Sequence, residues 1–333
     1  MPAKKSGKKA ATPSVDLTQW NNFDALPPVG DGPARGIVRK TPYRIVGGLD
    51  VPGRTIYPAE WESYLERASI STLLMCQDIE SFATQPQELI YRLQGLPRSC
   101  FPDLFVTGGF GTAYVEVKPL EILVSDENIE RYIEVARRLR ATGSAIFFFI
   151  DTDILVEPRV KTVMFLNRYA RTILSAEALG KTQQIADKKI LPLKQLQAEA
   201  GLTLRDVYAM LAQRHLSMDL STSLRSDSFV WLPSKSLPEL SFGGILASSE
   251  FSDLLAELSL GRRPTDKRQL ALAKAGRQRV RRPAGLSMVG DFPRRKAGSR
   301  IYEPLDLLRD DGGQPTTVDG KKSQRAAKRR GVK

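Results

Sequence analysis

The fold of this chain is decided by the stretch FPDLFVTGGFGTAYVEVK, residues 101–118. Two of its parts, Phe101–Thr107 and Ala113–Val117, are rich in β-branched and aromatic residues, which predicts two strands. Between them, Gly108–Gly111 predicts a hairpin turn. A phosphate-binding loop is the weaker interpretation of these glycines, because such a loop leads from a strand into a helix.

Two carboxylates, Asp103 and Glu116, would meet at the ends of these antiparallel strands and are the candidate metal ligands. Lys118 follows Glu116 by two residues and therefore shares its strand face. Hard cations such as Mg²⁺ or Mn²⁺ prefer oxygen ligands, and a bound cation polarises a phosphate and lowers the pKa of water. Lys118 would position that water or stabilise charge growing on phosphorus. A hairpin with ordinary exposed charges is the alternative, because Pro-Asp and Glu-x-Lys are each common.

A third candidate ligand, Glu66, lies upstream in the segment from Pro58 to about Cys76, which predicts a helix. In that helix Trp61, Leu65 and Ala68 share one side. Glu66 lies about 100° around the helix axis from Leu65, so it flanks that side and can complete the metal shell.

Further segments extend this core. Asp126–Arg140 repeats apolar residues at helical spacing, Ala145–Ile150 is a continuous apolar run typical of a buried strand, and Arg159–Ala170 predicts another helix. The alternation of helices and strands predicts an α/β core with a mixed sheet over residues 36–175.

The pattern changes after about residue 176. Two short helices are predicted at Leu193–Gly201 and Thr203–Ala212, followed by short strand-like segments over Met218–Leu232. A helix, a turn containing glycine, a second helix and a β-ribbon together predict a winged-helix-like domain over residues 176–261. Any small helical domain is the alternative.

The net charge of +13 is concentrated at the two ends of the chain. Residues 262–333 carry 21 Lys and Arg against 7 Asp and Glu, a net charge of +14, and residues 1–12 carry four Lys and no acid. We therefore expect a basic disordered arm at residues 1–35 and a basic, largely disordered tail at 262–333. Such ends favour double-stranded DNA as a partner. A solubilising role or an acidic protein partner is the alternative.

Other features exclude whole classes of protein. No apolar run approaches the roughly 20 residues of a membrane helix, and the N-terminus lacks the apolar part of a secretory signal. We therefore expect no membrane partner and a cytoplasmic, nucleoid-associated location. Cys76 and Cys100 form neither a disulfide framework nor a metal-finger spacing. His215 is the only histidine, which excludes zinc sites built from several histidines.

The ordered set of a helical acid, Pro-Asp and acid-x-Lys resembles the restriction-endonuclease-like nucleases. Over roughly residues 55–235 the chain further resembles the TnsA family, the endonuclease subunit of heteromeric transposases. That resemblance rests on short motifs spread over both predicted domains, which are Ser63-x-x-Glu66, Gln85-Pro86, Pro102-Asp103, Glu116-Val117-Lys118-Pro119 and Ser226-Asp227-Ser228-Phe229-Val230.

The resemblance implies a Mg²⁺- or Mn²⁺-dependent DNA endonuclease that nicks the 5′ ends of a transposon. It would act with a transposase subunit that cuts the 3′ ends, under an ATP-dependent transposition regulator. The family's acidic active-site positions correspond to Glu66, Asp103 and Glu116, and its lysine corresponds to Lys118. Two alternatives stay open: a stand-alone restriction or repair nuclease, and a catalytically inactive DNA-binding assembly factor.

Overall fold

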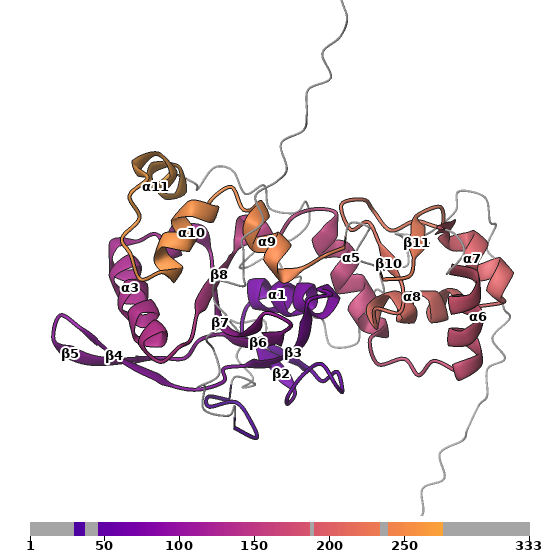
Figure 1. Cartoon of the computed structure of the whole chain (residues 1–333), viewed down its shortest axis with the longest axis horizontal. Helices are drawn as coiled ribbons and strands as arrows, with labels where there is room; N and C mark the ends of the chain where they lie inside the picture. The colour runs from indigo at the N-terminus through magenta and orange to yellow at the C-terminus, as the bar shows by residue number, and fades with distance from the viewer. Residues whose placement is uncertain (1–29, 37–45, 187–189, 234–238, 276–333) are drawn as a thin grey trace, which may run out of the picture. The chain divides into compact units, whose positions relative to one another are not determined.

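A mixed four-stranded sheet lies at the centre of the structure, a computed structural model that describes residues 30–36, 46–186, 190–233 and 239–275 (Figure 1). Its strands lie in the order β3 (Ile79–Thr84), β6 (Leu104–Gly108), β7 (Gly111–Lys118) and β8 (Ile146–Ile150). β6 is antiparallel to both β3 and β7, whereas β8 runs parallel to β7. The predicted α/β class with a mixed sheet is therefore confirmed.

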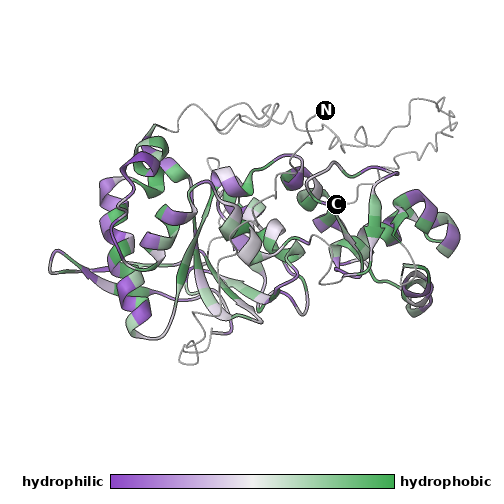
Figure 2. Ribbon diagram, turned by 45° about the horizontal axis from the view of Figure 1, so that its top comes forward, coloured by the Kyte–Doolittle hydropathy of each residue, from purple (hydrophilic) through white to green (hydrophobic). Residues whose placement is uncertain are grey.

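Helices cover both faces of this sheet. One face packs against α1 (Tyr64–Met75), which in turn packs against α5 (Arg159–Leu166), and the other against α3 (Asp126–Ala141) and α10 (Ser252–Ser259). Successive strand side chains point to opposite faces, so Val115 joins the core beside α1 while Tyr114 joins the core beside α3. Figure 2 shows hydrophobic residues concentrated in the strands and hydrophilic residues on the outer turns of the helices.

The helix predicted from Pro58 begins later, at Tyr64. Ser63 is its N-cap, and the Ser63 hydroxyl accepts a hydrogen bond from the Glu66 backbone N–H. The residues before it form β2 (Ala59–Trp61), which pairs antiparallel with β1 (Gly47–Leu49). The predicted start was too early because pairing with β1 keeps this segment extended.

The segment from Ile79 to Tyr91 contains one strand and the start of a second. β3 ends at Thr84, and Gln85 takes a left-handed backbone conformation with φ of 47°. The next strand, β4 (Leu89–Leu93), leaves the central sheet and pairs with β5 (Leu96–Cys100) in a separate hairpin (Figure 1). Short helices α2 (Leu120–Leu123) and α4 (Asp151–Ile154) follow β7 and β8.

Residues 176–231 form three helices and a small sheet. The helices are α6 (Ala176–Ala186), α7 (Leu193–Ala200) and α8 (Leu204–Ala212). The sheet has the order β10-β11-β9, with bounds Ser217–Met218, Phe229–Trp231 and Leu191–Pro192. Thr203 and Asp206 form a capping box at the start of α8, because the side chain of each accepts a hydrogen bond from the backbone N–H of the other.

After this domain the chain returns to the α/β core through α9 (Phe242–Ser248), α10 and α11 (Lys267–Lys274). α10 contacts α3 and β8, although its residues fall inside the range predicted for the small domain. α11 falls at the start of the predicted tail and contacts α2. The N-terminal arm over residues 1–29 and the tail over residues 276–333 lie outside the described residues. No helix in the described ranges is both long and apolar enough to span a membrane.

Candidate active site

Strand register places Asp103 and Glu116 side by side. Leu104 lies opposite Val115, so the next step along the two strands sets Asp103 opposite Glu116. Alternation places Glu116 on the face of the sheet that α3 covers. Both carboxylates are buried, with exposed fractions of 8% for Asp103 and 2% for Glu116. The structure thus brings together the two acids that the sequence suggested as a pair.

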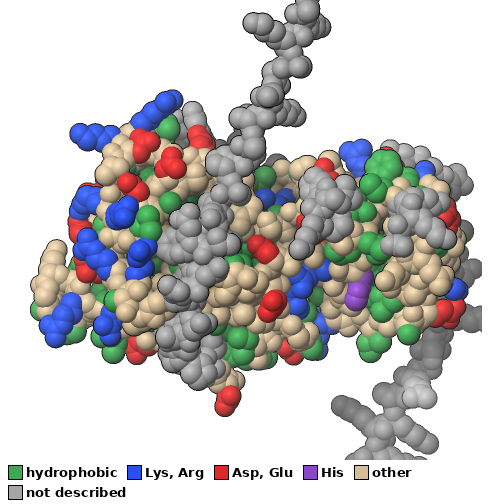
Figure 3. All heavy atoms as spheres, viewed as in Figure 1, with side chains coloured by type: hydrophobic (Ala, Val, Ile, Leu, Met, Phe, Trp, Pro, Cys, Tyr) green, Lys and Arg blue, Asp and Glu red, His purple; other side chains and the backbone are tan. Residues whose placement is uncertain are grey.

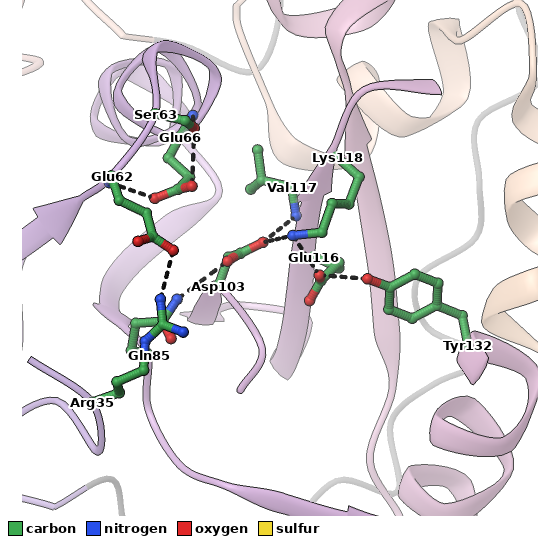
Figure 4. A network of polar contacts seen from close by, with 10 residues as sticks. All are labelled: Arg35, Glu62, Ser63, Glu66, Gln85, Asp103, Glu116, Val117, Lys118 and Tyr132. Carbon is green, nitrogen blue, oxygen red and sulfur yellow. Dashed lines mark hydrogen bonds and ion pairs between the residues drawn. The ribbon is translucent and has the colours of Figure 1, made fainter. Parts of the chain in front are cut away.

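The ammonium of Lys118 joins this pair (Figure 4). Its Nζ lies 2.9 Å from Oε1 of Glu116 and 3.5 Å from Oδ2 of Asp103. Burial by itself lowers the pKa of Lys118, but the charges of Asp103 and Glu116 outweigh burial, so the pKa is raised overall. Lys118 therefore keeps its positive charge between two carboxylates that would otherwise repel each other.

Three neighbouring groups fix the orientation of the carboxylates. The backbone N–H of Val117 donates to Oδ2 of Asp103 at 2.9 Å, and Nε2 of Gln85 donates to Oδ1 at 3.2 Å. The hydroxyl of Tyr132, on α3, donates to Oε1 of Glu116 at 2.6 Å. The rotamers of both acids are therefore set before any ligand arrives.

Burial of the two acids disfavours the charged form of Asp103. Its burial, followed by repulsion from Glu116, raises the pKa of Asp103 to about 8, although Lys118 acts in the opposite direction. A buried pair of carboxylates with only one ammonium is short of positive charge. The site is therefore poised to accept either a proton or a cation.

Glu66, the third predicted ligand, lies near this cluster but is engaged elsewhere. Its carboxylate accepts hydrogen bonds from the backbone N–H of Glu62 at 2.8 Å and from the hydroxyl of Ser63 at 2.9 Å. The Ser63-x-x-Glu66 motif thus serves the start of α1. Burial is the main cause that raises the pKa of Glu66, and the charge of Lys118 lowers it, so the two side chains are within electrostatic reach. No ion pair joins Glu66 to Lys118 among the described residues.

The donor set suits a hard cation in part. Within the described ranges, no group of three or more His, Cys, Asp or Glu residues is placed to hold a metal ion. Mg²⁺, however, is commonly held by only one or two carboxylates, with water completing its shell. Asp103 and Glu116 supply two carboxylates, and the buried Oε1 of Gln85, whose amide contacts Asp103, has no hydrogen-bond partner. These two acids therefore fit a single Mg²⁺ or Mn²⁺, without Glu66 as a direct ligand.

Sequence reasoning missed Tyr132 and Gln85 as site residues. Tyr132 falls three positions after Ile129 on the apolar side of α3, so a core role was its natural interpretation. Gln85 was visible only as part of the Gln85-Pro86 motif. Its positive φ, which turns the chain out of β3 toward Asp103, could not be read from the residue type.

Comparison with known proteins adds no relative. Searches of protein-family models and of curated proteins find no match for this chain.

Proposed function

We propose that this chain is a metal-dependent DNA endonuclease, a phosphodiester hydrolase that uses Mg²⁺ or Mn²⁺. The observation that carries the proposal is the contact of Lys118 with both Asp103 and Glu116. Two acids and a lysine on adjacent strands are the set that metal-assisted phosphodiester hydrolysis needs. More particularly, we propose a TnsA-like subunit of a heteromeric transposase, which nicks the 5′ ends of the transposon during excision.

The roles of the residues follow from their contacts. Asp103 and Glu116 would hold the cation, which when bound supplies charge to a phosphate oxygen and lowers the pKa of a coordinated water. The ammonium of Lys118 contacts Oε1 of Glu116, the same oxygen that accepts the hydrogen bond from Tyr132. From there its ammonium can orient a water molecule or stabilise negative charge on the phosphate. Glu66 would act at longer range, as a charge beside the site.

The architecture is compatible with a TnsA-like endonuclease. A mixed sheet with α1 on one face and α3 on the other, and acids on its central hairpin, supports a restriction-endonuclease-like core. The pair α7 and α8, with the small sheet of β9, β10 and β11, supports a winged-helix-like domain. Double-stranded transposon ends, a transposase subunit and an ATP-dependent regulator are the partners that this proposal entails.

A nicking assay on transposon-end DNA, with and without the partner transposase, tests the proposal. We expect weak activity alone and 5′-strand nicking with the partner, both abolished by Asp103→Ala, Glu116→Ala or Lys118→Ala. Circular dichroism of each variant checks that the fold survives. Full cleavage by Asp103→Ala, or cleavage in excess chelator, would exclude the site. Robust sequence-specific double-strand cleavage by the purified chain alone would favour a stand-alone restriction or repair nuclease.

One observation favours the inactive assembly factor as a second candidate. The carboxylate of Glu66, the third predicted ligand, is occupied by hydrogen bonds at the start of α1. Isothermal titration with Mn²⁺ separates the two functions. Binding that Glu116→Gln removes supports the nuclease, whereas DNA binding by a wild-type chain that takes up no Mn²⁺ supports the assembly factor.

A further inference from the structure

The β4–β5 hairpin is joined directly to the candidate active site. Its strands pair from Leu89 opposite Cys100 to Leu93 opposite Leu96. Gln94 and Gly95 close it with φ values of 51° and 79°, and positive φ at both positions is what a tight type I′ turn requires. Only Phe101 and Pro102 separate Cys100 from Asp103. The base of the hairpin therefore lies close to the site of the proposed chemistry.

One strand of the hairpin packs against a helix, and the other is exposed. β4 contacts α3, and Tyr91 is buried there with 8% exposure. In contrast, the four residues Leu96–Ser99 of β5 are all exposed. Two aliphatic side chains stand out, because Ile90 is 67% exposed and Leu96 is 59% exposed. In Figure 1 the hairpin extends away from the central sheet.

The charge of this hairpin is purely positive. Residues 89–100 include Arg92 and Arg98 and no acid. The guanidinium of Arg92 contacts only the carbonyl of Gly95 within the turn, at 3.3 Å, and neither arginine pairs with a carboxylate in the described ranges. Figure 3, viewed as in Figure 1, shows basic and apolar side chains together on the end of the molecule where the hairpin lies. This surface complements an anionic polymer that also offers apolar contacts.

Two features favour duplex DNA over a protein strand as the occupant. Pro97 lies in the exposed strand β5, and proline and charged residues on an edge strand discourage pairing with another strand. The major groove of B-DNA, about 12 Å wide, admits a two-stranded ribbon, whereas the minor groove is about half as wide. Aliphatic side chains in the major groove contact thymine methyl groups, and arginines bind phosphates or guanine edges.

We propose that the β4–β5 hairpin enters the major groove of duplex DNA beside the phosphodiester that is cut. Leu96, beside the turn, contacts base edges, and Arg92 and Arg98, which lie on opposite faces of the ribbon, contact the phosphates on the two sides of the groove. This inference rests on the proposed nuclease function, since it takes DNA as the substrate. It adds a binding arm that aligns the duplex with Asp103.

The experiment compares two full-length hairpin variants with wild type on a short fluorescein-labelled duplex of mixed sequence, in Ca²⁺ to prevent cleavage. Arg92→Ala with Arg98→Ala should lower the log–log salt slope of binding by about 1–2, because each lost phosphate contact contributes about 0.9. Leu96→Ser should leave the slope unchanged. It should also abolish the stretch of the duplex at which methylation of guanine N7 interferes with wild-type binding. Lys161→Ala with Ile173→Ser is the control for loss of a charge and an aliphatic side chain elsewhere, because Lys161 is on α5, which packs against α1, and Ile173 is 94% exposed.

The failures of the two proposals differ. If both hairpin variants bind with the wild-type slope and interference pattern while Asp103→Asn still abolishes cleavage, the hairpin inference is wrong and the nuclease stands. If the wild-type chain neither binds nor cuts DNA, both proposals are wrong. Loss of interference at minor-groove positions instead of guanine N7 would overturn the choice of groove. If the control variant loses as much binding as the hairpin variants, the effect comes from total charge, and the hairpin is not a specific DNA-binding arm.

Discussion

The hydroxyl of Tyr132 donates a 2.6 Å hydrogen bond to Oε1 of Glu116, the oxygen that Lys118 also contacts at 2.9 Å. Oε1 of Glu116 is therefore contacted by two donors, the neutral hydroxyl of Tyr132 from α3 and the charged ammonium of Lys118 from the same strand as Glu116. The burial of Tyr132, with the adjacent Glu116 charge, raises the pKa of Tyr132, so its hydroxyl stays a proton donor. This leaves Oε2 of Glu116 as the oxygen for a further ligand.

Removing the Tyr132 hydroxyl should weaken cation binding without removing it. Outer-shell contacts of this kind are typically worth about 10–100-fold in metal affinity or activity. We expect Tyr132→Phe to raise the Mn²⁺ dissociation constant at least about tenfold in calorimetric titration. The control is Tyr64→Phe on α1, a second partly buried tyrosine that makes no contact with either acid. An unchanged dissociation constant in Tyr132→Phe would show that Glu116 needs no support from α3.

The raised pKa of Asp103 predicts how stability depends on pH. Its pKa is about 8 in the folded chain against an ordinary value near 4, so the folded state binds this proton more tightly than the unfolded state. The free energy of unfolding should therefore fall as pH rises from about 4 to about 8, in the absence of a divalent cation. Asp103→Asn should remove that fall and raise the melting temperature near neutral pH. Each 1 kcal/mol gained corresponds to about 2–4 °C in a protein of this size.

Calorimetry across this pH range, on wild type and Asp103→Asn, checks the prediction. Mg²⁺ should raise the melting temperature of wild type and leave the variant unchanged, because a ligand stabilises only the state that binds it. A variant less stable than wild type at neutral pH would show that the Asp103 hydrogen bonds outweigh its burial cost.

Glu66 should matter more for stability than for cation binding. Its hydrogen bonds to Glu62 and Ser63 support the start of α1, and loss of a helix cap costs about 0.5–2 kcal/mol. We expect Glu66→Gln, which keeps an acceptor oxygen, to retain most of the stability, and Glu66→Ala to lose about 1 kcal/mol. Both should bind Mn²⁺ with affinity within a few-fold of wild type. A complete loss of Mn²⁺ binding in Glu66→Gln would restore Glu66 as a direct ligand.

The basic C-terminal segment should hold DNA without reading its sequence. Residues 276–333 carry 16 Lys and Arg against 6 Asp and Glu, and they lie beyond α11. Truncation after Ala275 keeps the ion pair between Lys274 and Asp126 and the buried Ala273. We expect weaker DNA binding and a flatter salt dependence, by about 0.9 per lost phosphate contact, with an unchanged melting temperature. An unchanged slope, with loss of a protein partner in a pull-down, would instead show that this segment binds a protein and not DNA.

The sequence by itself determined several local elements and the pairing of the two acids. Alternation, turn glycines and apolar runs predicted β6, β7, β8 and α3, because period-2 and period-3.6 patterns are properties of neighbouring residues. The hairpin around Gly108–Gly111 fixed the register, and the register sets Asp103 opposite Glu116 and Lys118 on the same face as Glu116.

Only the tertiary structure decided what surrounds that pair. Tyr132 reaches Glu116 because α3 packs on the face of the sheet that holds Glu116, and a packing choice between distant segments leaves no periodic signal in one sequence. Glu66 was expected beside Asp103, yet its carboxylate turns to backbone and hydroxyl groups of its own helix start, since those donors lie closest. The raised pKa of Asp103 likewise follows from burial, which depends on the whole fold and not on the residues next to Asp103 in the chain.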